Sequence, residues 1–202
     1  MALQWYFFNA APLIEKRFYT SFEYPFFVKT QGLVRKRFLG VDESNHGRIP
    51  EIFVGAYSNN PLSLNPTSLE KSREFSPVIM NVESNALFYH LVFSADFIKA
   101  LDSESLKVVA IAELVHAVEG LETVVYDGEL REHKRQCLCR LISPNVNLIV
   151  VPHADETYPL VNKADNLANL IHKYYAVKGG PRSKYNSHEI EPDLDYYLRI
   201  LK

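Results

Sequence analysis

Hydrophobic and polar positions along the chain follow two different periods, one before about residue 100 and one after it. The first part holds short apolar runs bounded by Asn, Gly, Pro and Ser, a pattern typical of strands. These runs predict strands at residues 36–42, 51–58 and 86–93. Only a short turn containing Asn, Gly and Pro separates the first two runs, so we expect those two strands to be antiparallel.

After residue 100, apolar residues recur at helical spacing in three segments that alternate with two further apolar runs. A Ser and an acid begin the first helical segment and Gly120 follows it, which are typical start and stop signals of a helix. The pattern predicts helices at 103–120, 130–142 and 160–175 and strands at 123–128 and 147–152. Three strands followed by helix, strand, helix, strand and helix predict an α/β fold, a mixed five-stranded sheet with helices on both faces.

Two segments lie outside this regular order. Residues 1–34 are crowded with aromatic side chains, and we expect an N-terminal elaboration packed on a core domain at 35–176. Residues 177–202 predict a basic loop and a C-terminal helix near 194–201. The aromatic segment would cover the sheet or make a contact in a homo-oligomer. A second interpretation is a base-stacking surface, since cations are interleaved with its rings and follow them: Lys16, Arg17, Lys29, Arg35, Lys36 and Arg37.

Composition narrows the class of protein. Of the 202 residues, 47% are apolar and 23% are charged, as in a globular protein that buries a core. The formal net charge of −2 excludes a global basic field, so any contact with nucleic acid must come from local patches. Cys137 and Cys139 are too close in sequence for an unstrained disulfide, which predicts reduced thiols. No run reaches the roughly 18 apolar residues of a membrane helix, and no secretory signal is evident, so we expect a cytoplasmic protein without a membrane partner.

Acidic residues end two of the predicted strands. Asp42 follows the apolar run of the first strand and is followed by Glu43, Ser44 and Asn45, while Asp127 ends the strand at 123–128. Carboxylates at the ends of buried strands are where α/β proteins carry out metal and phosphate chemistry. Alternation along the first strand places Glu43 on the face opposite to Asp42.

The order of elements resembles the ribonuclease H-like fold, and the resemblance extends to motifs over residues 36–175. The stretch from Glu104 to Asp127 is similar in spacing and character to the corresponding helix and strand of ribonuclease H. Val41-Asp42-Glu43-Ser44-Asn45 and the 163–168 segment Lys-Ala-Asp-Asn-Leu-Ala more closely resemble an uncharacterised branch of that superfamily, with an Asp-Glu-Ser-Gly motif and an Ala-Asp-Leu helix motif. Asn45 stands where that branch usually has Gly, and Asn166 where it usually has an aliphatic residue.

The resemblance implies four catalytic and metal-binding acids, which are Asp42, Glu104, Asp127 and Asp165. It implies a nuclease that hydrolyses phosphodiester bonds with two Mg²⁺ or Mn²⁺ ions about 3.5–4 Å apart. Hard divalent cations prefer oxygen ligands, and carboxylates packed this densely repel one another without a cation. Asp42 would bridge both ions, Glu104 and Asp127 would hold one, and Asp165 the other. As an alternative, each acid has an ordinary structural role, in a turn, at a helix start or on a solvated helix.

Other residues are candidates for auxiliary roles. Glu113, nine residues after Glu104, could point inward in its place, and Asp155 could substitute for Asp165. His46 and His153 would lie at the same edge of the sheet, where either could transfer a proton near neutral pH or have a surface role. His90 and His116 fall inside apolar elements and are expected to be core histidines.

Cations near the end of the last core helix are candidates for nucleic-acid binding: Lys173, Lys178, Arg182 and Lys184. With Gly179-Gly180-Pro181 they suit contact with a phosphate backbone, of RNA, DNA or a hybrid, or they form a solvated loop. A competing function is a catalytically inactive ribonuclease H-like module that binds nucleic acid or protein. A zinc hydrolase built from His46, His153 and Asp155 is a third possibility, with ligands from separate loops.

Overall fold

The computed structural model describes residues 36–44, 50–66, 88–178 and 189–201. All of them belong to one compact unit, residues 34–202. The N-terminal elaboration expected at 1–34, with its role in a homo-oligomer, lies outside the described residues. Within the described part of the chain, no helix is both long and apolar enough to span a bilayer.

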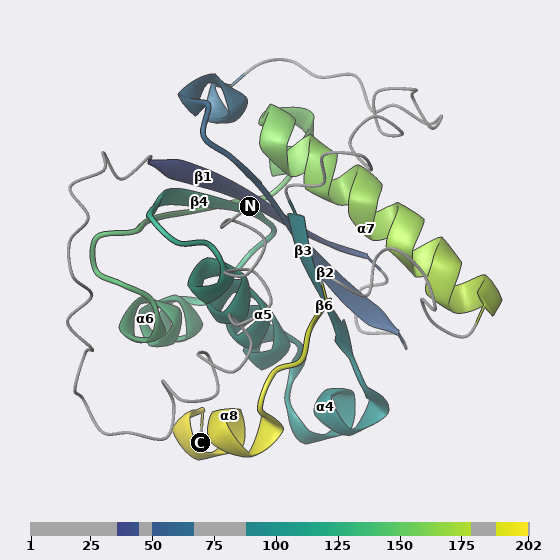
Figure 1. Cartoon of the computed structure of the whole chain (residues 1–202). Coiled ribbons are helices and arrows are strands. Elements are labelled where there is room, and N and C mark those ends of the chain that lie inside the picture. Colours follow the sequence, from purple (N-terminus) through teal and green to yellow (C-terminus); the bar gives the residue numbers. More distant parts are fainter. Residues whose placement is uncertain (1–35, 45–49, 67–87, 179–188, 202) are drawn as a thin grey trace, which may run out of the picture. The chain divides into compact units, whose positions relative to one another are not determined.

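The core of the unit is a mixed sheet of six strands in the order β5-β4-β1-β2-β3-β6 (Figure 1). β1 pairs antiparallel with β2 and parallel with β4, β2 pairs antiparallel with β3, and β5 is parallel to β4. Five strands agree with the expected ones: β1 (Arg37–Ser44), β2 (Glu51–Ser58), β3 (Phe88–Phe93), β4 (Leu121–Asp127) and β5 (Asn147–Val151).

The expected count of five strands is wrong because a sixth strand, β6 (Glu189–Ile190), pairs parallel with β3. Two residues are too few to produce an alternating pattern, so the sequence gives no signal for β6. Its pairing with His90 and Leu91 returns the C-terminal segment to the sheet.

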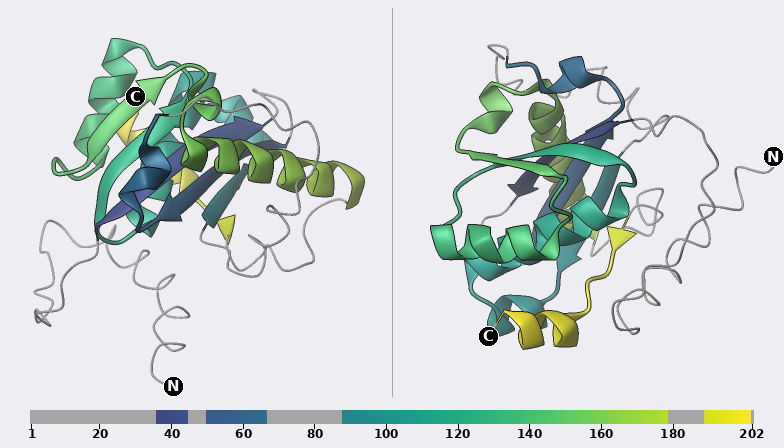
Figure 2. Two further views of the ribbon diagram at one scale, coloured as in Figure 1. Left: turned by 90° about the horizontal axis from the view of Figure 1, so that it is seen from above. Right: turned by 90° about the vertical axis from the view of Figure 1, so that its left-hand side faces the viewer.

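Helices cover both faces of the sheet. α5 (Ser103–Ala117) and α6 (Glu132–Leu141) lie on one face and α7 (Pro159–Lys178) on the other, as Figures 1 and 2 show. The three main helices were expected, whereas three short helices before and between them were not. These are α4 (Ala95–Ala100) and the 3-10 turns η1 (Pro61–Leu64) and η2 (Ala154–Glu156). The closing helix, expected near 194–201, is α8 (Leu194–Ile200).

α5 is a largely buried helix that begins and ends at the signals in its sequence. Its N-cap is Asp102, whose carboxylate accepts a hydrogen bond of 2.9 Å from the Ser105 N–H, and not the expected Ser103. After the helix, Gly120 adopts a φ of 70°, which glycine reaches without strain, and the chain turns into β4. Because α5 is buried from Ser105 to Val115 except at Lys107, it forms the centre of the larger core.

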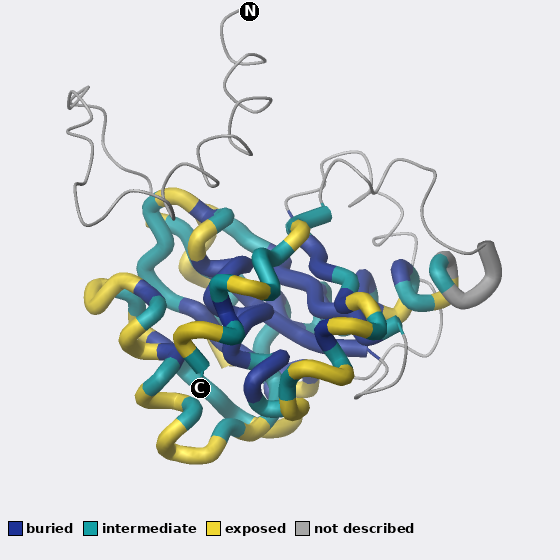
Figure 3. The backbone as a smooth tube through the Cα atoms, turned by 90° about the horizontal axis from the view of Figure 1, so that it is seen from below, coloured by how far each residue is buried: buried dark blue, intermediate teal, exposed yellow. Residues whose placement is uncertain are grey.

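Two large hydrophobic cores and a small third cluster of Val125, Ala154 and Val161 hold the layers of the described residues together. The core between the sheet and α5 includes Leu39, Phe53, Leu91 and Leu106, and the core between the sheet and α7 includes Val54. The central strands β1 and β2 are therefore buried over most of their length. Figure 3 draws the buried residues of the chain in dark blue. Successive residues of β1 point alternately toward α5 and toward α7. This alternation decides which helix each polar residue of β1 faces.

Candidate active site

The polar residues at the end of β1 are divided between the two faces of the sheet. Gly40 faces α7, because a Cβ there would lie 2.6 Å from the backbone carbon of Leu160 and the backbone nitrogen of Val161. Alternate residues of a strand share a face, so Asp42 and Ser44 also face α7. Asp42 is 6% exposed, a low value for a carboxyl group.

α7 runs alongside β1 in the same direction and brings Asp165 close to Asp42. Leu160 lies against Gly40, and nine residues later Asn169 contacts the side chain of Ser44. Four residues of a strand and nine residues of a helix both span about 13 Å, so positions 40–44 of β1 run alongside positions 160–169 of α7. Asp165, one helical turn after Val161, thus comes to the level of Asp42, and its charge raises the pKa of Asp42.

The other two members of the site come from the ends of β4 and β5. Asp127 is the last residue of β4, and β5 is followed by a turn in which His153 adopts a left-handed φ of 59°. This turn leads into η2 and places the backbone N–H of Asp155 3.2 Å from Oδ2 of Asp127, to which it donates. The two carboxyl groups also share a hydrogen bond, and Asp155 is buried.

Asp42, Asp127, Asp155 and Asp165 thus form one electrostatic group, which we call the aspartate cluster. Burial, together with the charges of Asp127, Asp165 and Asp155, raises the pKa of Asp42 to about 9, although the hydrogen bond from the Glu43 N–H lowers it. Burial also raises the pKa of Asp127, with a contribution from the hydrogen bond to Asp155. At neutral pH Asp42 therefore holds a proton, which relieves the repulsion within the cluster.

Glu43 lies on the opposite face, as alternation along the strand predicts. Its carboxylate accepts a hydrogen bond of 2.9 Å from the hydroxyl of Tyr126, and Nζ of Lys107 lies 3.2 Å away. Tyr126 is fully buried, and Lys107 stands 5.8 Å above its ring. Two partners thus hold the Glu43 side chain on the face of the sheet that α5 covers. The backbone nitrogen of Glu43 donates a hydrogen bond of 2.6 Å to Oδ1 of Asp42.

Two of the expected acids are placed elsewhere. Glu104, in the first turn of α5, accepts a hydrogen bond of 3.3 Å from the Arg131 N–H, and its other oxygen lies 3.6 Å from Nε of that residue. Glu113 accepts a hydrogen bond of 2.8 Å from the hydroxyl of Tyr197 on α8. Both acids are on α5, which packs on the face of the sheet opposite to α7, so the structure does not bring them to the aspartate cluster.

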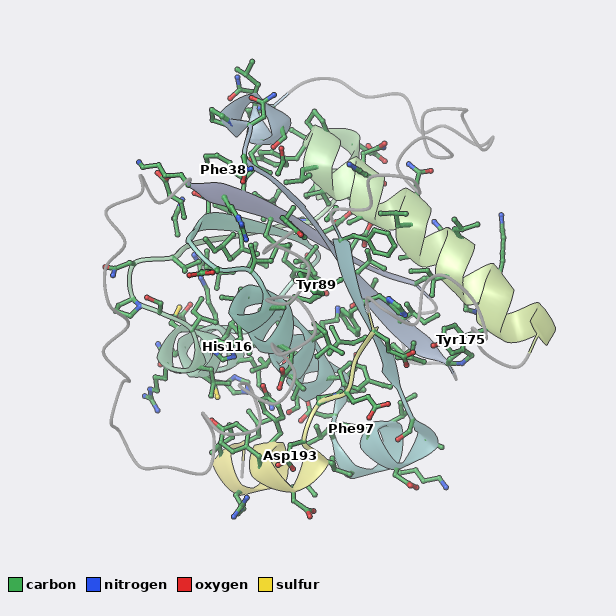
Figure 4. All side chains as sticks on the ribbon, viewed as in Figure 1. Phe38, Tyr89, Phe97, His116, Tyr175 and Asp193 are labelled. Atoms are coloured by element: carbon green, nitrogen blue, oxygen red, sulfur yellow. The ribbon has the colours of Figure 1, made fainter. Side chains whose placement is uncertain are left out.

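The histidines are distributed around the molecule. His153 is exposed and stands two residues before Asp155, whereas His46 lies outside the described residues. His90 is fully buried on β3, as expected, with Nε2 3.9 Å from the Glu189 carboxylate. The expectation of a core histidine is wrong for His116, which is exposed near the end of α5, with its Nε2 3.0 Å from the carbonyl oxygen of Leu141 (Figure 4).

Of the cations expected to bind nucleic acid, the described residues include two. Lys173 is exposed on α7, eight residues after Asp165, and Lys178 is the last residue of that helix. Arg182 and Lys184 lie outside the described residues.

The donors of the aspartate cluster suit a hard divalent cation, since all are carboxylate oxygens and two of the four residues are buried. Among the described residues, however, no three His, Cys, Asp or Glu side chains are placed to hold one ion together. Binding of a metal would therefore require carboxylate side chains to rotate toward one another and Asp42 to release its proton.

Three asparagines on α7 were not singled out from the sequence, although their spacing places them on one side of the helix with Asp165. Asn162 donates to the carbonyl oxygen of Asp155, and Asn166 donates to the carbonyl and side-chain oxygens of Asn162. Asn169 donates to Asp165 over 2.7 Å. The recurrence of Asn at 162, 166 and 169 around an acid was the available signal.

No protein family model and no curated protein sequence matches the chain. Among solved structures, it is similar to ribonuclease HII in the PCNA complex from Archaeoglobus fulgidus, with 16% identity, a TM-score of 0.48 and coverage of 74% of this chain and 82% of that one. It is also similar to ribonuclease H2 from Pyrococcus horikoshii OT3, with 14% identity, a TM-score of 0.50 and coverage of 74% and 83%. At this identity the similarity to the Pyrococcus horikoshii structure concerns the fold alone, and it confirms the predicted α/β class with a ribonuclease H-like fold.

Proposed function

We propose that the protein is a divalent-metal-dependent nuclease that cleaves phosphodiester bonds at the aspartate cluster. The observation that carries the proposal is the burial of Asp42 at the end of a central strand, with three other aspartates close enough to raise its pKa. Strongly shifted carboxyl groups of this kind are enriched at functional sites. The ribonuclease H-like fold, which occurs in nucleases, supports the same conclusion.

In this proposal Asp42 is the central ligand, Asp127 and Asp155 act as a pair, and Asp165 approaches from α7. Asp155 takes the place expected for Glu104, because it contacts Asp127 whereas Glu104 contacts Arg131. Mg²⁺ or Mn²⁺, when bound, would activate a water molecule and neutralise charge on the leaving oxygen. The residues of the chain would hold the carboxylates together, and Asp42 would give up its proton as a cation replaces it.

The substrate in this proposal is nucleic acid, either RNA, DNA or a hybrid. Lys173, two turns beyond Asp165 on α7, would contact a phosphate near the cluster, together with Lys178, Arg182 and Lys184. His153, exposed beside η2, would be positioned to exchange protons with solvent at the same edge. Membership of the uncharacterised branch with the Asp-Glu-Ser-Gly motif is part of the same proposal.

The proposal is tested by incubating labelled RNA, DNA and hybrid duplexes with the purified protein and Mn²⁺. We expect cleavage of at least one substrate, and a loss of about 100-fold or more with Asp42→Asn, since changes in the residues that support metal ligands already cost 10–100-fold. Glu104→Gln is the matched control and should keep its activity. If no substrate is cleaved and Mn²⁺ does not raise the melting temperature, the nuclease function is wrong.

A second candidate function is a catalytically inactive module of the same fold that binds nucleic acid or protein. It is favoured by the lack, among the described residues, of three side chains placed to share one ion. For nucleic acid, the two functions separate in a binding assay without metal, by fluorescence anisotropy with labelled RNA and DNA. An inactive module would bind equally well with and without Mn²⁺ and would tolerate Asp42→Asn.

A further inference from the structure

An open pocket, which we call the edge pocket, lies at the start of β1, at the edge of the sheet opposite to the aspartate cluster. Phe38 pairs with Ser58, the last residue of β2, and β4 runs parallel to β1, so the start of β1, the end of β2 and the start of β4 meet there. The volume of the edge pocket is about 720 Å³, which suits a small organic ligand. The described residues that line it are Lys36, Phe38, Asn59, Pro61 and Glu122.

Two of these residues give the edge pocket an apolar wall. Phe38, labelled in Figure 4, is half-buried because it packs against the core between the sheet and α7. Pro61 begins η1 and is exposed. A planar ring of a bound molecule suits such a wall, because planar rings stack on aromatic side chains.

The turn after β2 holds Asn59 and Pro61 in place without using the amide of Asn59. The N–H of Asn60 donates over 3.0 Å to Oγ of Ser58, and Oδ1 of Asn60 accepts a hydrogen bond of 3.0 Å from the Leu62 N–H. Asn59 is exposed, and within the described part of the chain its side chain makes no hydrogen bond. Its amide therefore offers two donors and one acceptor to a bound molecule.

Lys36 and Glu122 add a cation and an anion to the same pocket. Nζ of Lys36 donates over 3.1 Å to Oε1 of Glu122, and 74% of the Lys36 side chain is exposed, so its remaining donors are available. Oε2 of Glu122 is buried and has no hydrogen-bond donor among the described residues. A donor on a bound molecule would stabilise this oxygen, because an enclosed polar atom without a partner is costly and the last side-chain bond of glutamate rotates readily.

We infer that the edge pocket binds a nucleotide, an inference that goes beyond the proposed function and does not depend on the aspartate cluster. The base stacks on Phe38 with its polar edge against Asn59, whose amide matches the donor and acceptor of adenine. The phosphate contacts Lys36, and a sugar hydroxyl donates to Glu122. An amino acid would leave the apolar wall without a ring, and an acyl chain would leave the amide and the carboxylate unpaired.

The test is a titration of the ¹⁵N-labelled full-length protein with adenosine monophosphate and with adenosine, in EDTA, followed by NMR. We expect shifts of backbone amides within 36–38, 59–62 and 121–123, and tighter binding of the monophosphate. Lys36→Gln should weaken binding of the monophosphate up to about 5-fold, as loss of an exposed ion pair does, and leave adenosine unchanged. Asn59→Ala should weaken binding of both about 3- to 10-fold, the cost of a lost hydrogen bond.

Asn65→Ala and Lys99→Gln are the matched controls, since both residues are exposed and neither lines the edge pocket. Both variants should bind like the wild type. An equal loss in either control, or an equal loss of the two ligands in Lys36→Gln, would overturn the inference. Shifts confined to other residues, or no shift at all, would overturn it as well.

A nucleotide reaches the edge pocket either free in solution or as one unit of a nucleic-acid strand, and a short oligodeoxyadenylate separates these sources. Tighter binding of the oligonucleotide than of the monophosphate, with the same losses in Lys36→Gln and Asn59→Ala, would assign the pocket to a strand. Binding of the monophosphate alone would assign it to a free nucleotide. Because EDTA removes divalent metal, the titration is separate from cleavage, and a protein that cleaves nucleic acid without these shifts would keep the proposed function and lose the inference.

Discussion

At the scale of single residues, Asp42 is a carboxyl group in an environment that opposes its ionisation. It is buried, and Asp127, Asp155 and Asp165 add negative charge around it. A buried acid that remains protonated in the native state destabilises that state relative to the unfolded chain, because the acid ionises freely in the unfolded chain. The cost grows with pH only where the two states differ in protonation, between the ordinary pKa of 3.8 and the native value of about 9, and it remains in full above that range.

This environment predicts that the metal-free protein becomes less stable as pH rises from about 5 to 9. In that window the unfolded state binds fewer protons than the native state, so the free energy of unfolding falls by up to about 1.4 kcal/mol per pH unit from this group. Asp42→Asn should remove much of the slope and stabilise the protein at pH 8. Urea unfolding at a series of pH values measures the effect, and a slope unchanged by the substitution would contradict the raised pKa.

At the scale of elements, the contact between β1 and α7 sets the distance between Asp42 and Asp165. It depends on Gly40, where even a methyl group would meet the backbone of Leu160 and Val161. Backbone atoms of a helix cannot move aside individually, so a larger residue at position 40 would displace the helix as a whole. Packing and the geometry of the cluster are thus coupled through one glycine.

Gly40→Ala should therefore destabilise the protein by about 1–3 kcal/mol and weaken Mn²⁺ binding as well. Gly55→Ala is the control, since its new Cβ would lie 3.0 Å from side-chain atoms of Leu114 and Leu39, which can adjust. Its loss of stability should be smaller, and its Mn²⁺ affinity should be unchanged. Chemical unfolding and calorimetric titration of both variants give the comparison, and equal Mn²⁺ affinities would argue against the coupling.

Elements with long, regular patterns could be predicted from the sequence, whereas features that depend on a single turn could not. The run between Pro50 and Asn59 identified β2 with its observed bounds, because turn residues flank it on both sides. Of the four residues of the cluster, the sequence predicts Asp42, Asp127 and Asp165 as ligands and Asp155 as a substitute for Asp165. Asp155 joins the cluster because His153 takes a left-handed conformation, which local sequence does not signal for histidine.

Glu104 shows that the sequence can predict where a residue lies on a helix without predicting which residue it contacts. Its position in the first turn of α5 was correct, but the packing of α6 supplies Arg131 as its partner. That contact joins residues 27 positions apart and could not be derived from spacing within the helix.

At the scale of the whole molecule, two hydrogen bonds from a tyrosine hydroxyl to a glutamate carboxylate attach the C-terminal segment, residues 189–201, to the rest of the domain. Tyr197 on α8 donates to Glu113 of α5 over 2.8 Å, and both residues are buried. Tyr175 on α7 donates to Glu189 of β6 over 3.0 Å in a more exposed setting. Burial raises the pKa of both glutamates, so each depends on its tyrosine for a hydrogen bond to the charged form.

Tyr197→Phe should cost about 1–3 kcal/mol, because it leaves the buried Glu113 carboxylate without its hydroxyl donor. Tyr175→Phe should cost less, since water can replace the hydroxyl at the partly exposed Glu189. The urea midpoints of the two variants at pH 7.5 provide the measurement. A larger loss for Tyr175→Phe would mean that β6, rather than α8, is the main attachment of the segment.

Metal binding and pH should also be linked in the intact protein. Ligation requires the carboxylates of the cluster to lose their protons, so stabilisation by Mn²⁺ should increase between pH 6 and pH 8.5. Mn²⁺ at 100 times its dissociation constant would add about 2.7 kcal/mol to the free energy of unfolding. Melting temperatures with and without Mn²⁺ test this, and a shift that is independent of pH would count against ligation by Asp42.

The short pairing of β6 with β3 has a consequence for self-association. The β3 sequence Phe-Tyr-His-Leu-Val-Phe contains no proline and no acidic or basic residue other than a histidine, which is the composition of segments that form intermolecular sheets. β6 pairs with His90 and Leu91 in the middle of this strand. Ile190→Pro, which is disfavoured in a paired strand, should expose the strand's edge and increase light scattering on storage. Two residues far from the aspartate cluster would in this way keep the protein from aggregating.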